Sequence, residues 1–377
     1  MDGVNPGGRA DVPATASAIS PRSWDTVLAF AFGLVLSALV LEGILRVFPE
    51  FALSSSVKHE LRWQAAHRHS DAAPDDVVER FSPALGWELT PSLRSHRVTT
   101  NSRGLRGARE YSPQAPPGIQ RVLCVGDSFT FGHGLADDET MPVQLEAALN
   151  AANLGRWEVL NLGVGGYGTD QQYLRLRRVG LSYHPDIVVL GFFEEDVRRN
   201  AVSFRDYAKP YFDVHDGTLR LRNVPVPPPD VVLAQRLSRP RSYAVSFFQS
   251  LPEYVVDEIS ELPLPWPVDI SGTRMGRVTL AILDAMRDTV GRHHARFLVV
   301  VIPRRVTRWP TGNENMLVRW AEHTGTPALV LREAYLDLPV AERDGLYDGH
   351  WTAKGARVTA ELLADELRDA RPRGSSG

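Results

Sequence analysis

The sequence predicts a three-layer α/β domain, in which helices cover both faces of a five-stranded parallel sheet, joined to an N-terminal transmembrane helix. Three observations support this fold class. From residue 121 onward, short apolar runs alternate with longer amphipathic segments, which is the order of a doubly wound α/β fold. The short runs are continuously hydrophobic, as in strands buried on both faces. A longer apolar stretch near the N-terminus carries no charge from Thr26 to Leu41.

The N-terminal region divides into a leader and an apolar helix. Residues 1–23 are rich in Pro, Gly, Ala and Ser, which predicts a disordered leader. The stretch "WDTVLAFAFGLVLSALVLEGILRV" predicts a helix over 24–48, long enough to cross the roughly 30 Å hydrocarbon core of a bilayer. Glu42 and Arg46 stand four residues apart and can pair near the interface. We therefore expect a single-pass membrane anchor.

A cleavable secretory signal peptide is the alternative interpretation of this helix. The sequence "ALS" at 52–54 resembles a small-x-small cleavage site. Charges interrupt the apolar run before that site, so we favour a retained anchor. Basic residues flank the helix on both sides, and the positive-inside rule does not choose its orientation.

The remainder of the chain is expected to form one domain with an extension and an insertion. A stalk and N-terminal extension occupy 49–114, and the turn-rich part at 86–107 is expected to lie over the domain that follows. The α/β domain spans 115–370, and 371–377 forms a disordered tail. An insertion at 201–270 contains "PYFDVHDGTLRLR", whose central Asp-Gly predicts a tight β-hairpin. The "PVPPPD" segment after it predicts a stiff linker.

The strands and helices of the domain follow from the pattern of apolar residues. Strands are predicted at Val122–Val125, Glu158–Leu162, Ile187–Phe193, Phe297–Ile302 and Ala328–Leu331. Helices are predicted in "TMPVQLEAALNAA" with Thr140 as N-cap, from Met275 to about His294, and from Thr352 onward.

Composition excludes several classes of function. The chain has 42 basic and 45 acidic side chains, so no strong field recruits nucleic acid. The single cysteine, Cys124, can form neither an intramolecular disulfide nor a cysteine-based metal site. No histidine pair has the spacing of zinc ligands, and we expect neither a metal nor a cofactor.

Polar residues follow four of the predicted strands. Gly126-Asp127-Ser128 ends the first, "NLGVGGYGTD" the second, "FFEEDVRRN" the third, and "YDGHW" follows the fifth. Ligands of open parallel sheets bind outside the carboxyl ends of the strands. These loops can therefore bring a serine, backbone N–H groups, carboxylates and a histidine together.

The motifs "VGDSFTFG", "NLGVGGYGT" and "DGHWTAKG" resemble the conserved blocks of the SGNH (GDSL-type) hydrolases. The anchor, "TNSRGLRG" and "KPYFDV" are similar to a membrane-anchored bacterial branch, so the likeness spans about residues 24–368. It implies a flavodoxin-like fold, with Ser128 as nucleophile, His350 as base and Asp348 as the acid that orients it. The implied donors to an oxyanion are the backbone N–H groups of Ser128 and Gly166.

The third oxyanion donor departs from the family pattern. Where the family has asparagine followed by aspartate, this chain has Glu195-Asp196, and an ionised glutamate only accepts hydrogen bonds. Three possibilities stay open: Asn200 supplies an amide, Glu195 is held protonated in a dry site, or two donors suffice. His133, in a glycine-flanked loop, is predicted to be a surface histidine.

These observations favour a membrane-anchored serine esterase. It would form an acyl-enzyme on O-acyl esters of glycans or lipids, with its catalytic domain outside the cytoplasm. An O-acyltransferase of the same fold, which moves the acyl group to a sugar or other alcohol, is the first alternative. A non-catalytic carbohydrate-binding protein is the second, motivated by Glu195.

Overall fold

The centre of the molecule is the predicted parallel sheet. The computed structural model describes residues 21–48, 78–152, 155–205, 207–232 and 242–369. Five parallel strands lie in the order β4-β3-β5-β8-β9, which is the doubly wound order expected from the sequence. Their bounds are β3 Ile119–Gly126, β4 Arg156–Asn161, β5 Ile187–Phe193, β8 Arg296–Ile302 and β9 Ala328–Val330.

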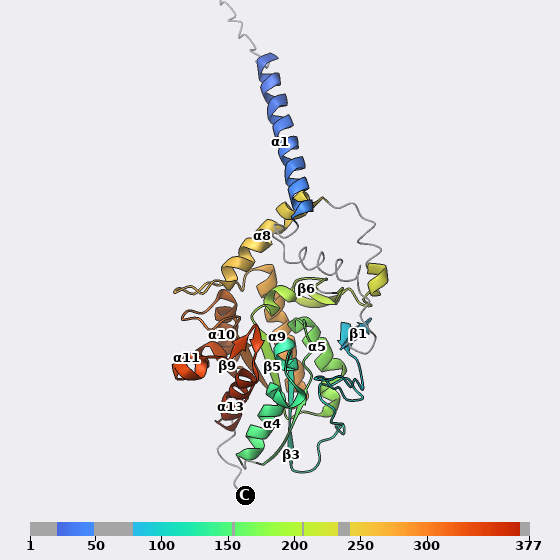
Figure 1. Cartoon of the computed structure of the whole chain (residues 1–377), viewed down its shortest axis with the longest axis vertical. Helices are drawn as coiled ribbons and strands as arrows, with labels where there is room; N and C mark the ends of the chain where they lie inside the picture. Colours follow the sequence, from blue (N-terminus) through green and yellow to red (C-terminus); the bar gives the residue numbers. More distant parts are fainter. Residues whose placement is uncertain (1–20, 49–77, 153–154, 206, 233–241, 370–377) are drawn as a thin grey trace, which may run out of the picture.

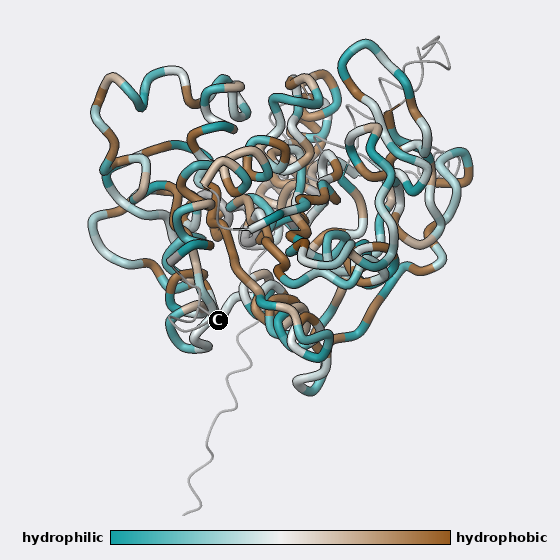
Figure 2. Tube along the Cα trace, turned by 90° about the horizontal axis from the view of Figure 1, so that it is seen from below, coloured by the Kyte–Doolittle hydropathy of each residue, from teal (hydrophilic) through white to brown (hydrophobic). Residues whose placement is uncertain are grey.

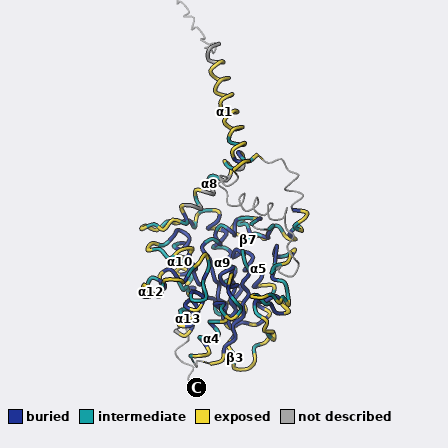
Figure 3. Tube along the Cα trace, viewed as in Figure 1, coloured by how far each residue is buried: buried dark blue, intermediate teal, exposed yellow. Residues whose placement is uncertain are grey.

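Helices cover both faces of the sheet, as the hydrophobic strands require. On one face lie α5 (Thr169–Arg178), α9 (Arg274–Arg292) and α10 (Gly312–Thr324). On the other lie α4 (Met141–Ala151), α11 (Leu331–Asp337) and α13 (Ala353–Asp369). Successive β3 residues alternate between the two cores: Leu123 packs with the first set and Cys124 with the second. The apolar segments gather in the interior (Figure 2), and the strands are buried (Figure 3).

The N-terminal extension packs against the glycine-rich loop that follows β4. It begins with the hairpin of β1 (Glu79–Ser82) and β2 (Gly86–Leu89). The indole N–H of Trp87 donates to the Gly165 carbonyl at 2.9 Å, and the Tyr167 hydroxyl donates to the Trp87 carbonyl. The extension thus holds the loop from the outside. The domain boundaries themselves stay predictions, and much of the predicted stalk lies outside the described residues.

The insertion contributes a hairpin and a long helix. Strands β6 (Tyr211–His215) and β7 (Thr218–Arg222) pair around Asp216-Gly217, where both residues have positive φ, as the sequence predicts. Helix α8 (Tyr243–Glu261) then runs from the lower end of α1 to the body of the domain (Figure 1). Other short elements include η3 (Asp137–Glu139), η4 (Gly180–Tyr183) and α12 (Val340–Arg343).

Helix α1 (Pro21–Val47) projects away from the domain (Figure 1). The most apolar 18-residue window within Trp24–Val47 has a mean hydropathy of 2.3, and none of that window is buried. It is long and apolar enough to cross a membrane, a property it shares with signal sequences. The signal-peptide cleavage site considered above, at 52–54, lies outside the described residues.

Candidate active site

Ser128 stands where β3 ends and the four-residue helix α3 (Ser128–Phe131) begins. Asp127 is the N-cap of α3, and its Oδ1 accepts a hydrogen bond from the Phe129 N–H at 2.9 Å. The sharp turn leaves Ser128 at the carboxyl edge of the sheet, with its side chain largely buried. The sequence Gly-Asp-Ser therefore does two things at once: it caps a helix and presents a hydroxyl.

The glycine-rich loop after β4 passes directly against α3. A Cβ on Gly163 would lie 2.2 Å from the Phe131 nitrogen, so only glycine allows this approach. Gly166 has φ +74°, a conformation that glycine adopts readily. Neither the Ser128 amide nor the Gly166 amide donates to another group among the described residues. Both predicted oxyanion donors thus keep a free N–H.

His350 is brought to Ser128 by a small hairpin. Strands β10 (Tyr347–Asp348) and β11 (His350–Trp351) pair around Gly349, which has φ +71°. The His350 Nε2 lies 2.9 Å from the Ser128 Oγ, within hydrogen-bond distance. Phe129 packs against the imidazole with 5.0 Å between ring centroids. This is the nucleophile–base contact that the sequence motifs predict.

The surroundings of His350 keep it neutral. Burial lowers the pKa of the imidazole, and the neighbouring His133 lowers it further by charge repulsion. The centroids of the two imidazole rings are 4.7 Å apart. His133 is exposed, as predicted, but it also lies at the site, which its position in the sequence did not reveal.

Asp348 does not contact the imidazole in this structure. It faces His350 across the hairpin as its Cα partner, but its side chain is exposed. In the described part of the chain, no hydrogen bond joins the Asp348 carboxylate to His350. Its predicted role in orienting the histidine stays a prediction.

Asn200 and a protonated Glu195 both fail as a third donor in this structure. The Asn200 side chain is fully buried elsewhere: its Oδ1 accepts from the Asp170 N–H, and its Nδ2 donates to Thr279. The Glu195 carboxylate lies among arginines, with Arg199 at 3.3 Å and Arg198 at 3.6 Å. Although burial raises the pKa of Glu195, these cations lower it overall, so the group is ionised. Of the three possibilities raised by the sequence, an oxyanion hole with two donors is the one that stays a prediction.

Arg199 is the residue at this edge that sequence analysis missed. Its guanidinium, almost fully buried in α6 (Asp196–Arg199), lies 2.7 Å from the Asp127 Oδ2 and 3.1 Å from the Asp196 Oδ1. The same NH1 donates to the Tyr167 carbonyl at 3.1 Å. One cation therefore contacts two buried carboxyl groups and ties the nucleophile turn to the glycine-rich loop. Burial raises the pKa of Asp196 well above its ordinary value in spite of this contact. The local sequence "EEDVRR" does not indicate this ion pair, because the pair joins Arg199 to Asp127, which is distant in the sequence.

A second buried ion pair links the insertion to the same edge. Lys209, fully buried before β6, donates to the Asp170 carboxylate and to the Arg199 carbonyl. The Asp170 N–H in turn donates to Asn200. The "KPYF" segment noted in the sequence thus fixes the start of the insertion beneath the catalytic edge.

A cavity of about 250 Å³ opens beside these residues, at the ends of β5 and β8. Burial raises the pKa of Glu194 in its wall to about 7, and this carboxyl group accepts from the Thr311 hydroxyl at 2.8 Å. Its lining is polar and charged, with two apolar residues from the insertion: Glu194, Glu195, Glu261, Leu262, Pro263, Arg304, Arg305, Thr307 and Thr311. Neither Ser128 nor His350 lines this cavity, but it adjoins the catalytic edge through Glu195, whose carboxylate pairs with Arg199.

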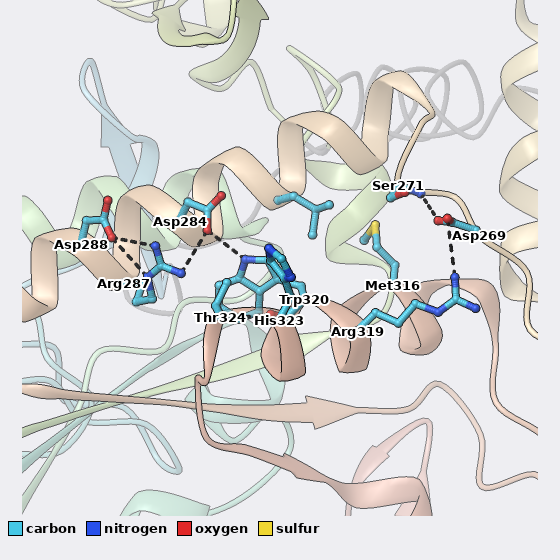
Figure 4. Close-up of a pocket in the computed structure, with 11 residues that line it drawn as sticks. Asp269, Ser271, Asp284, Arg287, Asp288, Met316, Arg319, Trp320, His323 and Thr324 are labelled. Carbon is cyan, nitrogen blue, oxygen red and sulfur yellow. Dashed lines mark hydrogen bonds and ion pairs between the residues drawn. The ribbon is translucent and has the colours of Figure 1, made fainter.

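A larger hollow of about 680 Å³ lies between α9 and α10. Figure 4 shows the Trp320 indole N–H hydrogen-bonded to Asp284. Arg287 forms ion pairs with both Asp284 and Asp288. Neither Ser128 nor His350 lines it, and its charged residues already pair with one another. It therefore has no part in the chemistry argued here.

Replacing Arg199 by methionine should destabilise the fold strongly. The substitution leaves Asp127 and Asp196 buried without their cation, which costs on the order of 3–5 kcal/mol. Arg357→Met removes an exposed pair with Glu361 and should cost less than about 1 kcal/mol. Chemical denaturation of both variants measures the difference, and equal losses would contradict a structural role for the Arg199 cluster.

Comparison with solved structures finds matches of low similarity. Solved structures that align include a lipolytic protein of the G-D-S-L family from Desulfitobacterium hafniense (14% identity, 66% of this chain and 99% of that chain, TM-score 0.36). A lipase/acylhydrolase from Enterococcus faecalis aligns at 16% identity over 68% of this chain and 100% of that chain, with a TM-score of 0.39. Similarity this low decides nothing about substrate.

The sequence itself assigns the family. No curated protein matches the chain. Residues 124–358, which include Ser128, Gly166 and His350, match the model of the GDSL-like Lipase/Acylhydrolase family. Because this match covers more than half of the chain, the protein belongs to the GDSL-like lipase/acylhydrolase family and is an ester hydrolase.

Proposed function

We propose that the protein is a membrane-anchored serine esterase that deacylates O-acyl esters through an acyl-enzyme on Ser128. The observation that carries the proposal is the 2.9 Å contact between the Ser128 Oγ and the His350 Nε2. A serine hydroxyl becomes a strong nucleophile only when a base accepts its proton. The imidazole, neutral because its pKa is lowered, is able to do so near neutral pH.

The reaction proceeds in two halves. As the Ser128 Oγ attacks the ester carbonyl, its proton passes to the His350 Nε2, and the imidazolium then protonates the leaving alcohol. Water, deprotonated by the same nitrogen, attacks the acyl-enzyme and releases the acid. The free amides of Ser128 and Gly166 bind the developing oxyanion in both halves.

A site with two donors remains catalytic. Losing one donor of an oxyanion hole slows the reaction by about a hundredfold to a thousandfold, which leaves most of the rate enhancement in place. Glu195, which motivated the alternative of a non-catalytic binding protein, is held by arginines instead of facing the nucleophile unpaired. The positive charges of these arginines therefore weaken the electrostatic repulsion between the Glu195 carboxylate and the oxyanion.

The contacts of α1 support a retained anchor. The Glu42 Oε2 accepts hydrogen bonds from the Ser242 hydroxyl at 2.9 Å and from the Ala244 N–H at 2.8 Å, which caps α8. Leu45 is 1% exposed although it lies at the end of an otherwise exposed helix. A signal peptide that is removed makes no lasting contacts with the mature domain, so this docking favours an anchor.

The substrate we propose is an O-acyl ester of a glycan or lipid, with the catalytic domain outside the cytoplasm. The cavity beside Glu195 offers carboxylates, arginines and hydroxyls, groups that bind hydroxyl-rich molecules, and Leu262 and Pro263 add an apolar wall. Envelope glycans and lipids carry such esters close to a membrane.

Ser128→Ala should abolish ester hydrolysis. Removing the nucleophile of such a site lowers kcat by about 10⁴-fold or more. Hydrolysis of p-nitrophenyl acetate measures the loss, and a fluorophosphonate probe should label the wild type and not the variant. Equal hydrolysis by both proteins would overturn the assignment.

Asp348→Asn should have a smaller effect. A buried aspartate that orients a catalytic histidine is worth about 10⁴-fold in kcat, but the Asp348 side chain is exposed and does not hydrogen-bond to the imidazole. We therefore expect a loss of about ten- to a hundredfold, measured as kcat on the same ester. A loss as large as that of Ser128→Ala would show that the carboxylate engages His350 during turnover.

His133→Ala should move the acid limb of the pH profile upward. The base works only when neutral, so activity falls as the pH drops through the pKa of His350. The His133 charge lowers that pKa, and removing it lets the pKa rise toward its ordinary value, so activity is lost at a higher pH. The exposed His323 on α10 is the control, since His323→Ala should leave the profile unchanged. If the acid limb of the pH profile of His133→Ala stays where it is in the wild type, His133 does not lower the pKa of His350.

A further inference from the structure

Helix α8 carries an exposed apolar stripe. Val245 is 53% exposed, Phe248 60%, Val255 44% and Ile259 44%. Steps of three, seven and four residues place all four side chains on one face of the helix. A row of large apolar side chains on an otherwise folded domain is typical of a contact surface. These four residues are called the α8 stripe below.

The stripe begins where α1 ends. Glu42 caps α8 through Ser242 and Ala244, and the Arg46 guanidinium lies 5.2 Å from the centre of the Tyr243 ring. At 1.5 Å per residue, Val245 and Phe248 lie within about 10 Å of this cap along the helix. The first turns of α8 are therefore held next to the end of α1 (Figure 1).

We propose that the α8 stripe rests on the bilayer surface, an inference that depends on the proposed membrane anchor. If α1 spans the hydrocarbon core, its final turn lies at the interface and carries the start of α8 with it. Apolar side chains of interfacial helices enter the membrane by about 5–10 Å, which is the depth available to Val245 and Phe248. The bilayer thus supplies a partner for the stripe, whose four side chains are exposed among the described residues.

The other end of α8 reaches the catalytic edge. Glu261, in its last turn, forms an ion pair with Arg198 at 3.3 Å and another with Arg304. It also lines the 250 Å³ cavity beside Glu195. A helix of 19 residues is about 28 Å long, so α8 holds the catalytic edge within about 30 Å of the end of α1. The ester substrate is accordingly one carried at the membrane surface, such as a lipid or a lipid-linked glycan.

Site-specific labels on the full-length protein test the placement of α8. The only native cysteine, Cys124, is fully buried, so single cysteines at exposed positions can be labelled with an NBD fluorophore. Phe248→Cys reports on the stripe, Ser37→Cys on the middle of α1, and Val340→Cys on an exposed apolar position of α12. The proteins are reconstituted into phosphatidylcholine/phosphatidylglycerol vesicles that contain nitroxide-labelled lipid.

The label at position 248 should be quenched by the nitroxide lipid at least twofold more than the label at 340. If position 37 is quenched but 248 behaves like 340, the inference about α8 is wrong and the anchor stands. If position 37 is not quenched either, the anchor itself is wrong. Blue-shifted emission at 248 without quenching would mean that a protein surface covers the stripe, which also overturns the inference.

Activity supplies a second measurement. Phe248→Asp should slow hydrolysis of a long-chain ester embedded in the vesicles about tenfold, because the helix no longer seats on the bilayer. The same variant should hydrolyse soluble p-nitrophenyl acetate at the wild-type rate. Val340→Asp, which places the same charge on α12, should change neither rate. Equal loss on both substrates for Phe248→Asp would overturn the inference.

Discussion

The contact between the Ser128 hydroxyl and the His350 imidazole is the constraint on which the rest of the structure depends. The two residues are 222 positions apart and meet because parallel strands release their loops at one edge of the sheet. Ser128 follows a central strand, and the hairpin around Gly349 returns His350 to the same edge. The Phe129 ring packs against both the His350 imidazole and Trp351, so the hydrogen bond is supported by the core and not by flexible loops alone.

Buried charge organises the back of the active site. Asp127 and Asp196 are both fully buried, and Arg199 is the cation that they share. Burying one carboxylate without a partner is costly, and burying two near each other is more so, which explains the position of Arg199. The same arginine also forms an ion pair with Glu195 at 3.3 Å. The replacement of the family's asparagine by glutamate is thus accommodated by a local ion-pair network.

The insertion connects the catalytic edge to α1. Its first part is fixed beneath the catalytic edge by the buried Lys209–Asp170 pair. Its helix α8 is capped by Glu42 at one end and paired through Glu261 at the other. Because a helix resists compression along its axis, fixing both ends of α8 fixes the distance between the segments that it joins. The end of α1 and the active site therefore keep a defined separation.

The sequence by itself determined the fold class, the five strands, the hairpin at Asp216-Gly217, the apolar helix and the family. These depend on local patterns of hydrophobicity, turn residues and short motifs, which can be read along the chain. Only the tertiary structure decided that Asn200 faces the core, that Glu195 is ionised among arginines, and that His133 adjoins His350. Each of these depends on which distant side chains share a buried space, and the energy of a buried charge or amide is set by those neighbours and not by its place in the sequence.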